Sequence, residues 1–406
     1  MKKYIIITLC IISVVGLTHC KSPKPVLAQN KQQKILPDTL SNFSVRAADE
    51  WTTIFYRKHG WFGADGIFSI NLNGVEHQPA NKIDKVFMYF SDTMTGKVIG
   101  NDSVQNFKMV NNSYATLTGI SPEKESVEIY LNTDKNGSPT NYFSPNSQNS
   151  KPNEYYWFGD GFVNQDDDNS INIFGYRVID NSEKSWDFEL TGVTLIIIPK
   201  HSKAPFNEHT QIDAPLFMDI EGVGKGTFGS AIYVNTKKAG ATNPDGFLYI
   251  YGLLDPNKKL VVARVRPKNL RKFDTWRYWD GKKWNKDINR VKPITNRVSN
   301  ELSLTAMEDG RFLLVFQEDG IGNHTAIRIA ESFTGPFGPI QRIWKAPEVN
   351  EPPGIIPYNA KAHPVLSTDD ELLISYNTIS FDYFNDILKY PHMYRPRFFW
   401  LQIINE

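Results

Sequence analysis

Cysteine is scarce in this sequence. Its 406 residues include two cysteines, Cys10 and Cys20, and both lie within the first twenty positions. The rest of the chain therefore has neither a disulfide framework nor a cysteine-based metal site. A His-x-x-His zinc pattern and a Ser or Cys nucleophile motif are also missing. We accordingly expect a protein that uses no metal and no cofactor.

An excess of charge of one sign is missing as well. Lys and Arg number 45, Asp and Glu number 44, and the net charge is +1. This balance supplies neither the basic field that suits nucleic acid nor an acidic tail for a basic partner. We therefore expect no nucleic-acid partner, and we expect a monomer.

The apolar stretch at residues 4–17 is too short for an ordinary membrane span. Lys2 and Lys3 precede it, and this order is typical of an export signal. Residues 17–20, Leu-Thr-His-Cys, resemble a bacterial lipobox, in which the cysteine is lipidated, although His19 stands where a small residue is usual. A plain secretory signal cleaved nearby is the alternative.

These features divide the chain into three predicted segments. Residues 1–19 are expected to form a lipoprotein signal peptide, and Cys20 is expected to carry the lipid that attaches the protein to a membrane. Residues 20–37 are polar and contain Pro and Gln, as in a flexible tether. Residues 38–406 form the folded part. We expect an exported cell-envelope lipoprotein on the periplasmic or surface side of an outer membrane.

Long amphipathic helical periods are lacking after residue 38, where only residues 42–56 have room for a short helix. Short runs of Val, Ile, Phe, Tyr and Leu recur instead, separated by Gly, Asn, Asp and Pro. This pattern predicts an all-β fold. Aromatic residues make up 13% of the chain, which suits dense packing between sheets or a surface that binds carbohydrate.

Five units recur along the chain, and each has two recognisable strands and room for about four. The first strands are expected at Gly66–Leu72, Gly161–Asn164, Phe228–Val234, Glu301–Ala306 and Ala362–Leu366. The second strands are expected near residues 85–92, 170–176, 245–251, 309–316 and 370–376. We predict a five-bladed β-propeller of four-stranded antiparallel blades. A two-domain sandwich is the rival, but no linker interrupts the recurrence.

Two strand openings share an aromatic-Gly-Asp-Gly pattern, Trp61 to Gly66 (with one Ala inserted) and Trp157 to Gly161. A carboxylate at the end of an apolar strand destabilises the fold unless it is paired, solvated in a cleft or functional. The alternative is that each Asp-Gly pair is a hairpin turn. Trp61 and Trp157 are candidate substrate-binding residues, since a ring face stacks on sugar C–H groups.

In a propeller the first strand of each blade lines the central channel, and its early residues face one common opening. The predicted register brings side chains from all five units to that opening: Asp65, Asp160, Ser230, Glu301 and His363. Three carboxylates and a histidine would then share one pocket.

Several stretches resemble the bacterial domain families of unknown function numbered 4185 and 5005. They are the runs at 61–66, 89–93, 108–112, 262–265, 279–284 and 359–364. The resemblance implies a five-bladed propeller similar to furanosidase-type glycoside hydrolases, and some members of the first family are endo-D-arabinanases. It therefore implies a glycan-cleaving site that acts on a furanoside-rich polysaccharide such as arabinan, although a fold alone does not establish activity.

Glycoside hydrolysis uses one protonated and one ionised carboxyl group, whose pKa values are set apart by their environment. We expect Asp65 to be the base or nucleophile, Glu301 the acid, and Asp160 a positioning group. In the hydrolases that the chain resembles, acids lie on the inner strands of successive early blades. The third inner strand carries Ser230 instead, which weakens the assignment of Glu301.

Other polar residues are candidates for binding the sugar. They are Asp92, Asn112, Arg264 and His363, and each has a structural alternative, namely a strand-end turn, a bridge between strands or a satisfied core histidine. Residues 166–168 are three Asp, which suits calcium, but they lack the rest of a calcium loop and fit better as a solvated turn. Trp276, Trp279 and Trp284 flank a hairpin and either stack on a glycan or pack at a blade edge.

Two further functions compete with the hydrolase. One is a surface lipoprotein that binds a polysaccharide or oligosaccharide without cutting it. The other is a structural or adhesion propeller that has no polar pocket. The presence or absence of product release separates the first from the hydrolase.

Overall fold

The computed structural model describes residues 38–182 and 187–404. The predicted signal peptide, the lipidation site at Cys20 and the tether lie outside the described residues. The expected short helix is present as α1 (Asp49–Ile54), and a second helix, α2 (Tyr383–Lys389), follows the last sheet's second strand. Among the described helices, none combines the length and the apolar character that crossing a membrane requires.

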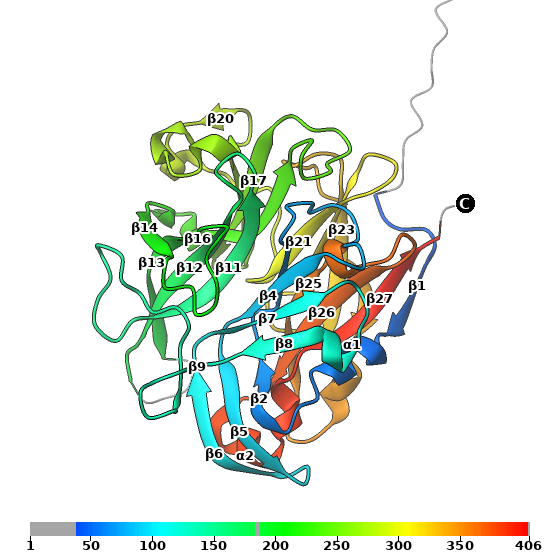
Figure 1. Ribbon diagram of the computed structural model, residues 1–406. Coiled ribbons are helices and arrows are strands. Elements are labelled where there is room, and N and C mark those ends of the chain that lie inside the picture. The colour runs from blue at the N-terminus through cyan, green and yellow to red at the C-terminus, as the bar shows by residue number, and fades with distance from the viewer. Residues whose placement is uncertain (1–37, 183–186, 405–406) are drawn as a thin grey trace, which may run out of the picture. The chain divides into compact units, whose positions relative to one another are not determined.

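Strands dominate the described chain, and the all-β prediction is confirmed (Figure 1). They form seven antiparallel sheets within the described residues. Five of these sheets have four or more strands. In these five sheets, neighbouring strands mostly follow one another in chain order. The exceptions are the sheet that joins both ends of the described chain and the sheet into which β5 and β6 are inserted in sequence.

The first two large sheets contain eight strands. The first has the order β3 (Phe68–Asn71), β4 (Lys85–Phe90), β7 (Ser113–Thr118) and β8 (Val127–Tyr130). The second has the order β11 (Tyr155–Asn164), β12 (Ser170–Asp180), β13 (Phe188–Ile198) and β14 (Thr210–Ala214).

The third large sheet has six strands. Its order is β15 (Phe217–Ile220), β16 (Gly224–Asn235), β17 (Phe247–Asp255), β18 (Lys259–Val265), β19 (Arg277–Trp279) and β20 (Trp284–Asn285). The fourth has the order β21 (Leu302–Ala306), β22 (Phe312–Gln317), β23 (His324–Ala330) and β24 (Gln341–Lys345).

The fifth large sheet joins segments from both ends of the described chain. Its order is β25 (Ile356–Ala362), β26 (Leu372–Ile379), β27 (Arg397–Ile403) and β1 (Phe43–Ala47). In Figure 1 the blue strand β1 lies beside the red strand β27.

Two small sheets complete the set. One contains β2 (His59–Ala64), β5 (Thr93–Ile99) and β6 (Ser103–Val110), and the other pairs β9 (Asn132–Thr133) with β10 (Pro139–Thr140). The predicted count of five four-stranded blades is therefore not confirmed, because the described strands divide into seven sheets and the third has six strands. The sequence pattern missed the small sheets because their strands are inserted between those of the larger ones.

The inner strands of the five large sheets pack side by side. Strand β11 contacts β3 and β16, and β21 contacts β16 and β25. Directly after β25, His363 forms a 2.9 Å hydrogen bond with Ser69 of β3. These contacts bring one strand from each large sheet to a common centre.

Three of the inner strands share a local irregularity. Strands β11, β16 and β25 each have a β-bulge, at 158–161, 228–231 and 358–361 respectively. A bulge leaves residues unpaired and turns their side chains away from the regular alternation. The unpaired residues include Asp160 and Ser230, so the predicted equivalence of these two positions agrees with the register.

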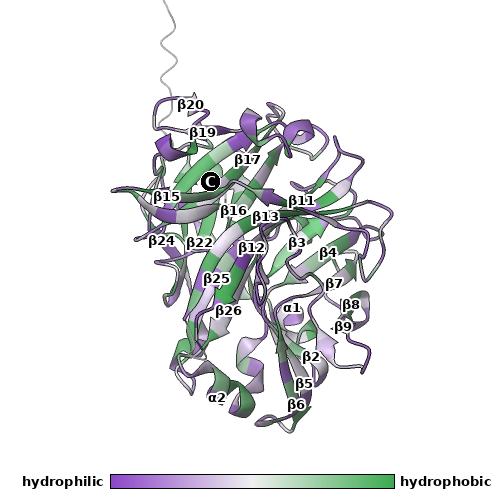
Figure 2. Cartoon of the chain, turned by 90° about the vertical axis from the view of Figure 1, so that its left-hand side faces the viewer, coloured by the Kyte–Doolittle hydropathy of each residue, from purple (hydrophilic) through white to green (hydrophobic). Residues whose placement is uncertain are grey.

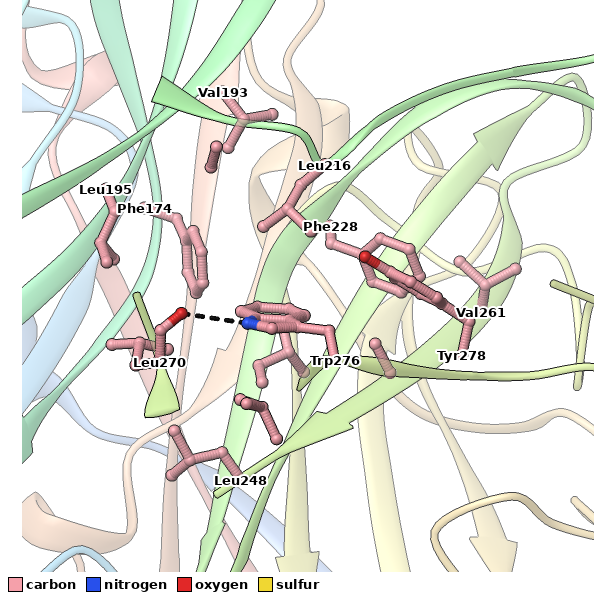
Figure 3. Close-up of a cluster of buried hydrophobic side chains, with 14 of the residues drawn as sticks. Phe174, Val193, Leu195, Leu216, Phe228, Leu248, Val261, Leu270, Trp276 and Tyr278 are labelled. Carbon is pink, nitrogen blue, oxygen red and sulfur yellow. Dashed lines mark hydrogen bonds between the residues drawn. The ribbon is translucent and has the colours of Figure 1, made fainter. Parts of the chain in front are cut away.

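Large apolar clusters lie between neighbouring sheets. The cluster of the second and third sheets includes Phe174, Phe228 and Trp276 (Figure 3). The indole of Trp276 is fully buried and donates a 3.0 Å hydrogen bond to the carbonyl of Leu270. Trp276 therefore packs in the core, and the packing alternative holds for this tryptophan.

Candidate active site

Asp65 lies between β2 and β3, which belong to different sheets, so Asp65-Gly66 is not a hairpin turn. Gly66 has φ +65°, and a Cβ there would lie 2.6 Å from the Ser91 hydroxyl, so a side chain is excluded. The backbone NH of Asp65 donates to the carbonyl of Asp92 at 3.1 Å, and Ser91 NH donates to the carbonyl of Asp65 at 2.8 Å. These bonds hold Asp65 and Asp92 on adjacent segments of backbone.

Asp65 is partly exposed as a residue, and its Oδ2 accepts a 2.9 Å hydrogen bond from the hydroxyl of Tyr358. Its Oδ1 is buried and has no hydrogen-bond partner among the described residues. Burial raises the pKa of Asp65 to about 6, although the hydroxyls of Tyr394 and Tyr358 act in the opposite direction. Asp65 is therefore ionised near neutral pH and able to take up a proton in mildly acidic solution.

Asp92, which follows β4, is also partly accessible. Burial raises the pKa of Asp92 well above its ordinary value, and the negative charge of Asp65 raises it further. The Asn111 amide, which donates to Oδ1 at 3.2 Å, and the Trp157 indole oppose this shift. Two carboxyl groups that titrate together in this way share protons, so one is ionised while the other is protonated.

Asp160 occupies the bulge of β11, so Asp160-Gly161 is not a hairpin turn either. Its Oδ2 accepts from the Ile232 NH at 2.8 Å and pairs with Lys361 Nζ at 3.0 Å, while Oδ1 accepts from the Gly161 NH at 3.1 Å. Asp160 and Lys361 are 7% and 5% exposed. Because both oxygens have partners, Asp160 fits a positioning role better than a direct chemical one.

Glu301, immediately before β21, is 6% exposed. Its Oε1 accepts a 2.7 Å hydrogen bond from Asn359, and its Oε2 is buried with no hydrogen-bond partner among the described residues. Burial raises the pKa of Glu301 well above its ordinary value, the charge of Asp65 adds to this, and Lys361 opposes it. Burial and the neighbouring acids thus both favour the protonated form of Glu301.

The bulge of β25 supplies a partner to each of the three predicted acids. Tyr358 donates to Asp65, Asn359 donates to Glu301, and Lys361 pairs with Asp160. Asn359 has a positive φ of 55°, a backbone conformation that asparagine tolerates better than most residues. The structure thus gathers Asp65, Asp160 and Glu301 around one short segment, and their charges act on one another.

His363 does not belong to this group. The sequence pattern placed it at the start of the fifth inner strand, whereas β25 ends at Ala362 and Pro364 begins a 3-10 helix. Its ring nitrogens contact the hydroxyls of Ser69 at 2.9 Å and Ser375 at 2.7 Å, and burial lowers its pKa to about 3. This is the satisfied core histidine of the structural alternative.

The remaining candidates have different surroundings. Trp61 is 2% exposed and donates to Ser113, so neither ring face is open. Asn112 is buried and exchanges two hydrogen bonds with the backbone of Phe143. Trp157 is partly accessible and lies near Asp92, as a sugar-binding ring would. Arg264 lies on β18, the third strand outward from the centre, away from the acids.

A small cavity of about 50 Å³ lies on the other side of Asp160. Glu76, Asp160 and Lys361 line it, whereas Asp65, Asp92 and Glu301 do not. Burial raises the pKa of Glu76 to about 8, and the charge of Asp160 raises it too. The sequence analysis did not single out Glu76, since a glutamate in a loop after a strand has no distinguishing pattern.

The described residues contain no group of three or more His, Cys, Asp or Glu that would hold a metal ion. Residues 166–168 lie in the turn between β11 and β12, where Asp166 pairs with Lys238 and Asp167 with Arg271. The turn interpretation therefore fits better than a calcium loop.

The family model described as Domain of unknown function (DUF5005) matches residues 48–403. No curated protein matches the chain. Solved structures do. A candidate hydrolase from Bacteroides ovatus ATCC 8483 has a TM-score of 0.67 and 19% identity, over 88% of this chain and 90% of that one.

Other structural neighbours are glycoside hydrolases. An exo-β-1,3-galactanase from Phanerochaete chrysosporium has a TM-score of 0.42 and 10% identity, over 86% of this chain and 67% of that one. An α-L-arabinofuranosidase from Clostridium thermocellum ATCC 27405 has a TM-score of 0.41 and 9% identity, over 77% and 82%. The similarity to the Bacteroides structure shows the fold.

Proposed function

Because this chain belongs to the DUF5005 family, whose description assigns no activity, we propose a function from the site itself: the protein hydrolyses glycosidic bonds. The observation that carries the proposal is the Asp65–Asp92 pair. These two residues lie on hydrogen-bonded backbone segments and are partly exposed, and the charge of Asp65 raises the pKa of Asp92. A glycoside hydrolase needs one ionised and one protonated carboxyl group at its cleavage point.

In this proposal Asp65 is the base or nucleophile, because its pKa of about 6 leaves it ionised near neutral pH. Two residues compete for the role of acid. The raised pKa of Glu301 favours its protonated form, but the residue is 6% exposed and has little surface with which to reach a sugar. The raised pKa of Asp92 also favours its protonated form, and Asp92 is more exposed, so the geometry favours Asp92 as the acid and leaves Glu301 to support the charge of the site.

Aromatic side chains around the pair suit a sugar. Trp157 lies beside Asp92, and the phenols of Tyr358 and Tyr394 act on Asp65. Rings of this kind stack on sugar C–H groups, and their polar edges form hydrogen bonds. We propose a furanoside-rich polysaccharide such as arabinan as substrate, on the family resemblance.

The proposal extends to the whole protein. The five large sheets would be the five blades of a propeller, with the small sheets as insertions. A lipid on Cys20 would hold a monomer at the cell envelope, through the tether at residues 20–37. A lipoprotein that binds glycan without cutting it is the competing function, and it predicts affinity that survives the loss of Asp65.

Product release from a panel of plant and mycobacterial arabinans and related polysaccharides tests the proposal. Wild-type protein is compared with Asp65→Asn, Asp92→Asn and Glu301→Gln, and circular dichroism checks the fold of each. Oligosaccharides released by the wild type and lost in Asp65→Asn would support hydrolysis. Retention of a polysaccharide in a native affinity gel without any product would favour the binding protein instead.

A further inference from the structure

The distribution of charge is uneven, although the net charge of the chain is +1. Residues 264–292 contain eleven Lys and Arg and three Asp, a net charge of +8, so the rest of the chain is −7. Nine of the eleven basic side chains are exposed. Within the part of the chain that the structure describes, Arg271 is the one member that forms an ion pair, with Asp167.

This stretch forms the outer edge of the third large sheet. It runs from β18 through β19 and β20, and the buried Trp276 anchors it to the core (Figure 3). Asp280 ties the hairpin between β19 and β20, since its Oδ1 accepts from the backbone NH of Lys282 and Lys283. The elements around β19 and β20 are largely hydrophilic in Figure 2. The lysines are therefore displayed on an ordered hairpin.

Aromatic rings lie among these charges. The guanidinium of Arg264 lies between the rings of Phe247 and Trp284, 4.4 Å from the centre of each. Arg266 lies 4.1 Å from the centre of Phe247, and Trp279 packs 5.2 Å from Trp284. A guanidinium held between rings keeps its donors in a fixed plane, which suits a carboxylate or sulfate. The rings of Trp279 and Trp284 are half-buried and keep part of their surface accessible.

We propose that this basic aromatic surface, made by Phe247 and residues 264–292, binds an anionic polysaccharide, one that carries carboxylate or sulfate groups. That the partner is a polysaccharide rests on the proposed function, whereas its negative charge follows from the exposed basic side chains. The surface is separate from the Asp65–Asp92 site, because β18 is the third strand outward in its sheet and β19 and β20 lie beyond it. It would hold an acidic chain while the site acts on a neighbouring part of the same material.

The composition of the surface argues against insertion into a bilayer. Amphipathic surfaces that insert into a membrane combine basic side chains with large apolar side chains that enter the lipid. None of the large hydrophobic side chains that are strongly exposed in the described chain falls within residues 264–292. Electrostatic attraction with partly open rings is instead the combination that suits a charged sugar chain.

Binding of polygalacturonate by the full chain tests the proposal, with fully methyl-esterified polygalacturonate of the same length as the uncharged control. We expect binding to the acidic polymer that is at least tenfold tighter than to the ester, and that weakens as salt rises from about 50 to about 500 mM. Equal affinity for the two polymers, or no binding to either, would overturn the proposal.

Matched variants locate the surface. Lys282→Ala/Lys283→Ala/Lys286→Ala is expected to weaken binding about tenfold, since it removes three exposed positive charges from the surface. Lys97→Ala/Lys135→Ala/Lys151→Ala removes the same charge from exposed positions elsewhere and should bind like wild type. Similar losses in both triple variants would contradict the proposal, because they would show a general charge effect.

Other occupants are distinguished in the same assay. Tighter binding to oligo-dT, or to vesicles containing phosphatidylglycerol, than to polygalacturonate would overturn the glycan assignment. Self-association of the protein that is abolished in Lys282→Ala/Lys283→Ala/Lys286→Ala would overturn it as well. Asp65→Asn should retain polygalacturonate binding. If the protein binds polygalacturonate but releases no product from any glycan, only the proposed hydrolysis is contradicted. If it releases product but shows no preference for the acidic polymer, only the proposed binding surface is contradicted.

Discussion

The hydroxyl of Tyr358 donates a 2.9 Å hydrogen bond to Oδ2 of Asp65, across 293 positions of sequence. The bond stabilises the ionised form of Asp65 and opposes the effect of burial on its pKa. Since Tyr358 lies at the bulge of β25, the protonation of Asp65, in the segment that leads into the first large sheet, depends on the last large sheet.

Replacing Tyr358 with Phe removes this donor and keeps the ring. We expect the pKa of Asp65 to rise above its value of about 6, and the acidic limb of the pH profile of kcat/KM to move upward by about one unit. Tyr376→Phe, which removes the phenol that bonds to Glu348 away from the site, is the matched control. An unchanged acidic limb in Tyr358→Phe would mean that another group controls it.

Asp92→Asn should reduce kcat about 100-fold to 10,000-fold, the usual effect of removing a general acid. Glu301→Gln should cost less, because that carboxyl is almost fully buried. Aryl glycosides with good leaving groups should restore much of the rate to Asp92→Asn, because they leave without protonation. A larger loss in Glu301→Gln, restored by the same substrates, would assign the acid to Glu301.

Asp160→Asn should destabilise the fold by about 3–5 kcal/mol, because it leaves the Lys361 ammonium buried without its counter-ion. The double variant Asp160→Asn/Lys361→Met removes both charges and should recover most of this loss. Urea unfolding measures the free energies. A loss below about 1 kcal/mol in the single variant would show that water replaces the carboxylate as partner.

Glu76→Gln should stabilise the protein in alkaline solution. Burial raises the pKa of Glu76 from 4.5 to about 8, so the folded state holds a proton that the unfolded state has released between these values. The stability of the wild type therefore falls as pH rises from about 4.5 to about 8, by an amount on the order of a few kcal/mol. The amide of the variant cannot ionise, so its advantage over the wild type grows across this range and stays constant above it. A difference that does not change with pH would contradict the assignment.

The predictable part of the fold was its strand content. Apolar runs near 85–92, 170–176 and 309–316 became β4, β12 and β22 because their side chains are buried between sheets. The fifth inner strand was misplaced because residues 356–362 include Asn359 and Lys361, which are polar and serve the acids. These polar side chains interrupt the alternation of apolar and polar residues, so the pattern that predicts a strand is missing.

The site was predictable in part, because its acids lie beside apolar strands. Asp65, Asp160 and Glu301 stood out as acids beside apolar strands, and the structure does gather them. The coupling of Asp65 to Asp92 depends on two backbone hydrogen bonds between segments about 26 residues apart, which no local pattern contains. The basic surface was hidden by a net charge of +1, since a sum over the chain conceals a local excess.

Strand β1 pairs with β27 along its whole length, from Phe43 opposite Ile403 to Ala47 opposite Phe399. Among the described strands, β1 is made first and β27 last. The fifth sheet therefore cannot be completed until β27 has been synthesised. Until then β1 has no partner, although all strands of the other four large sheets have already been synthesised. Chains that end before residue 397 should remain sensitive to proteases, whereas released chains that extend through residue 404 should be resistant.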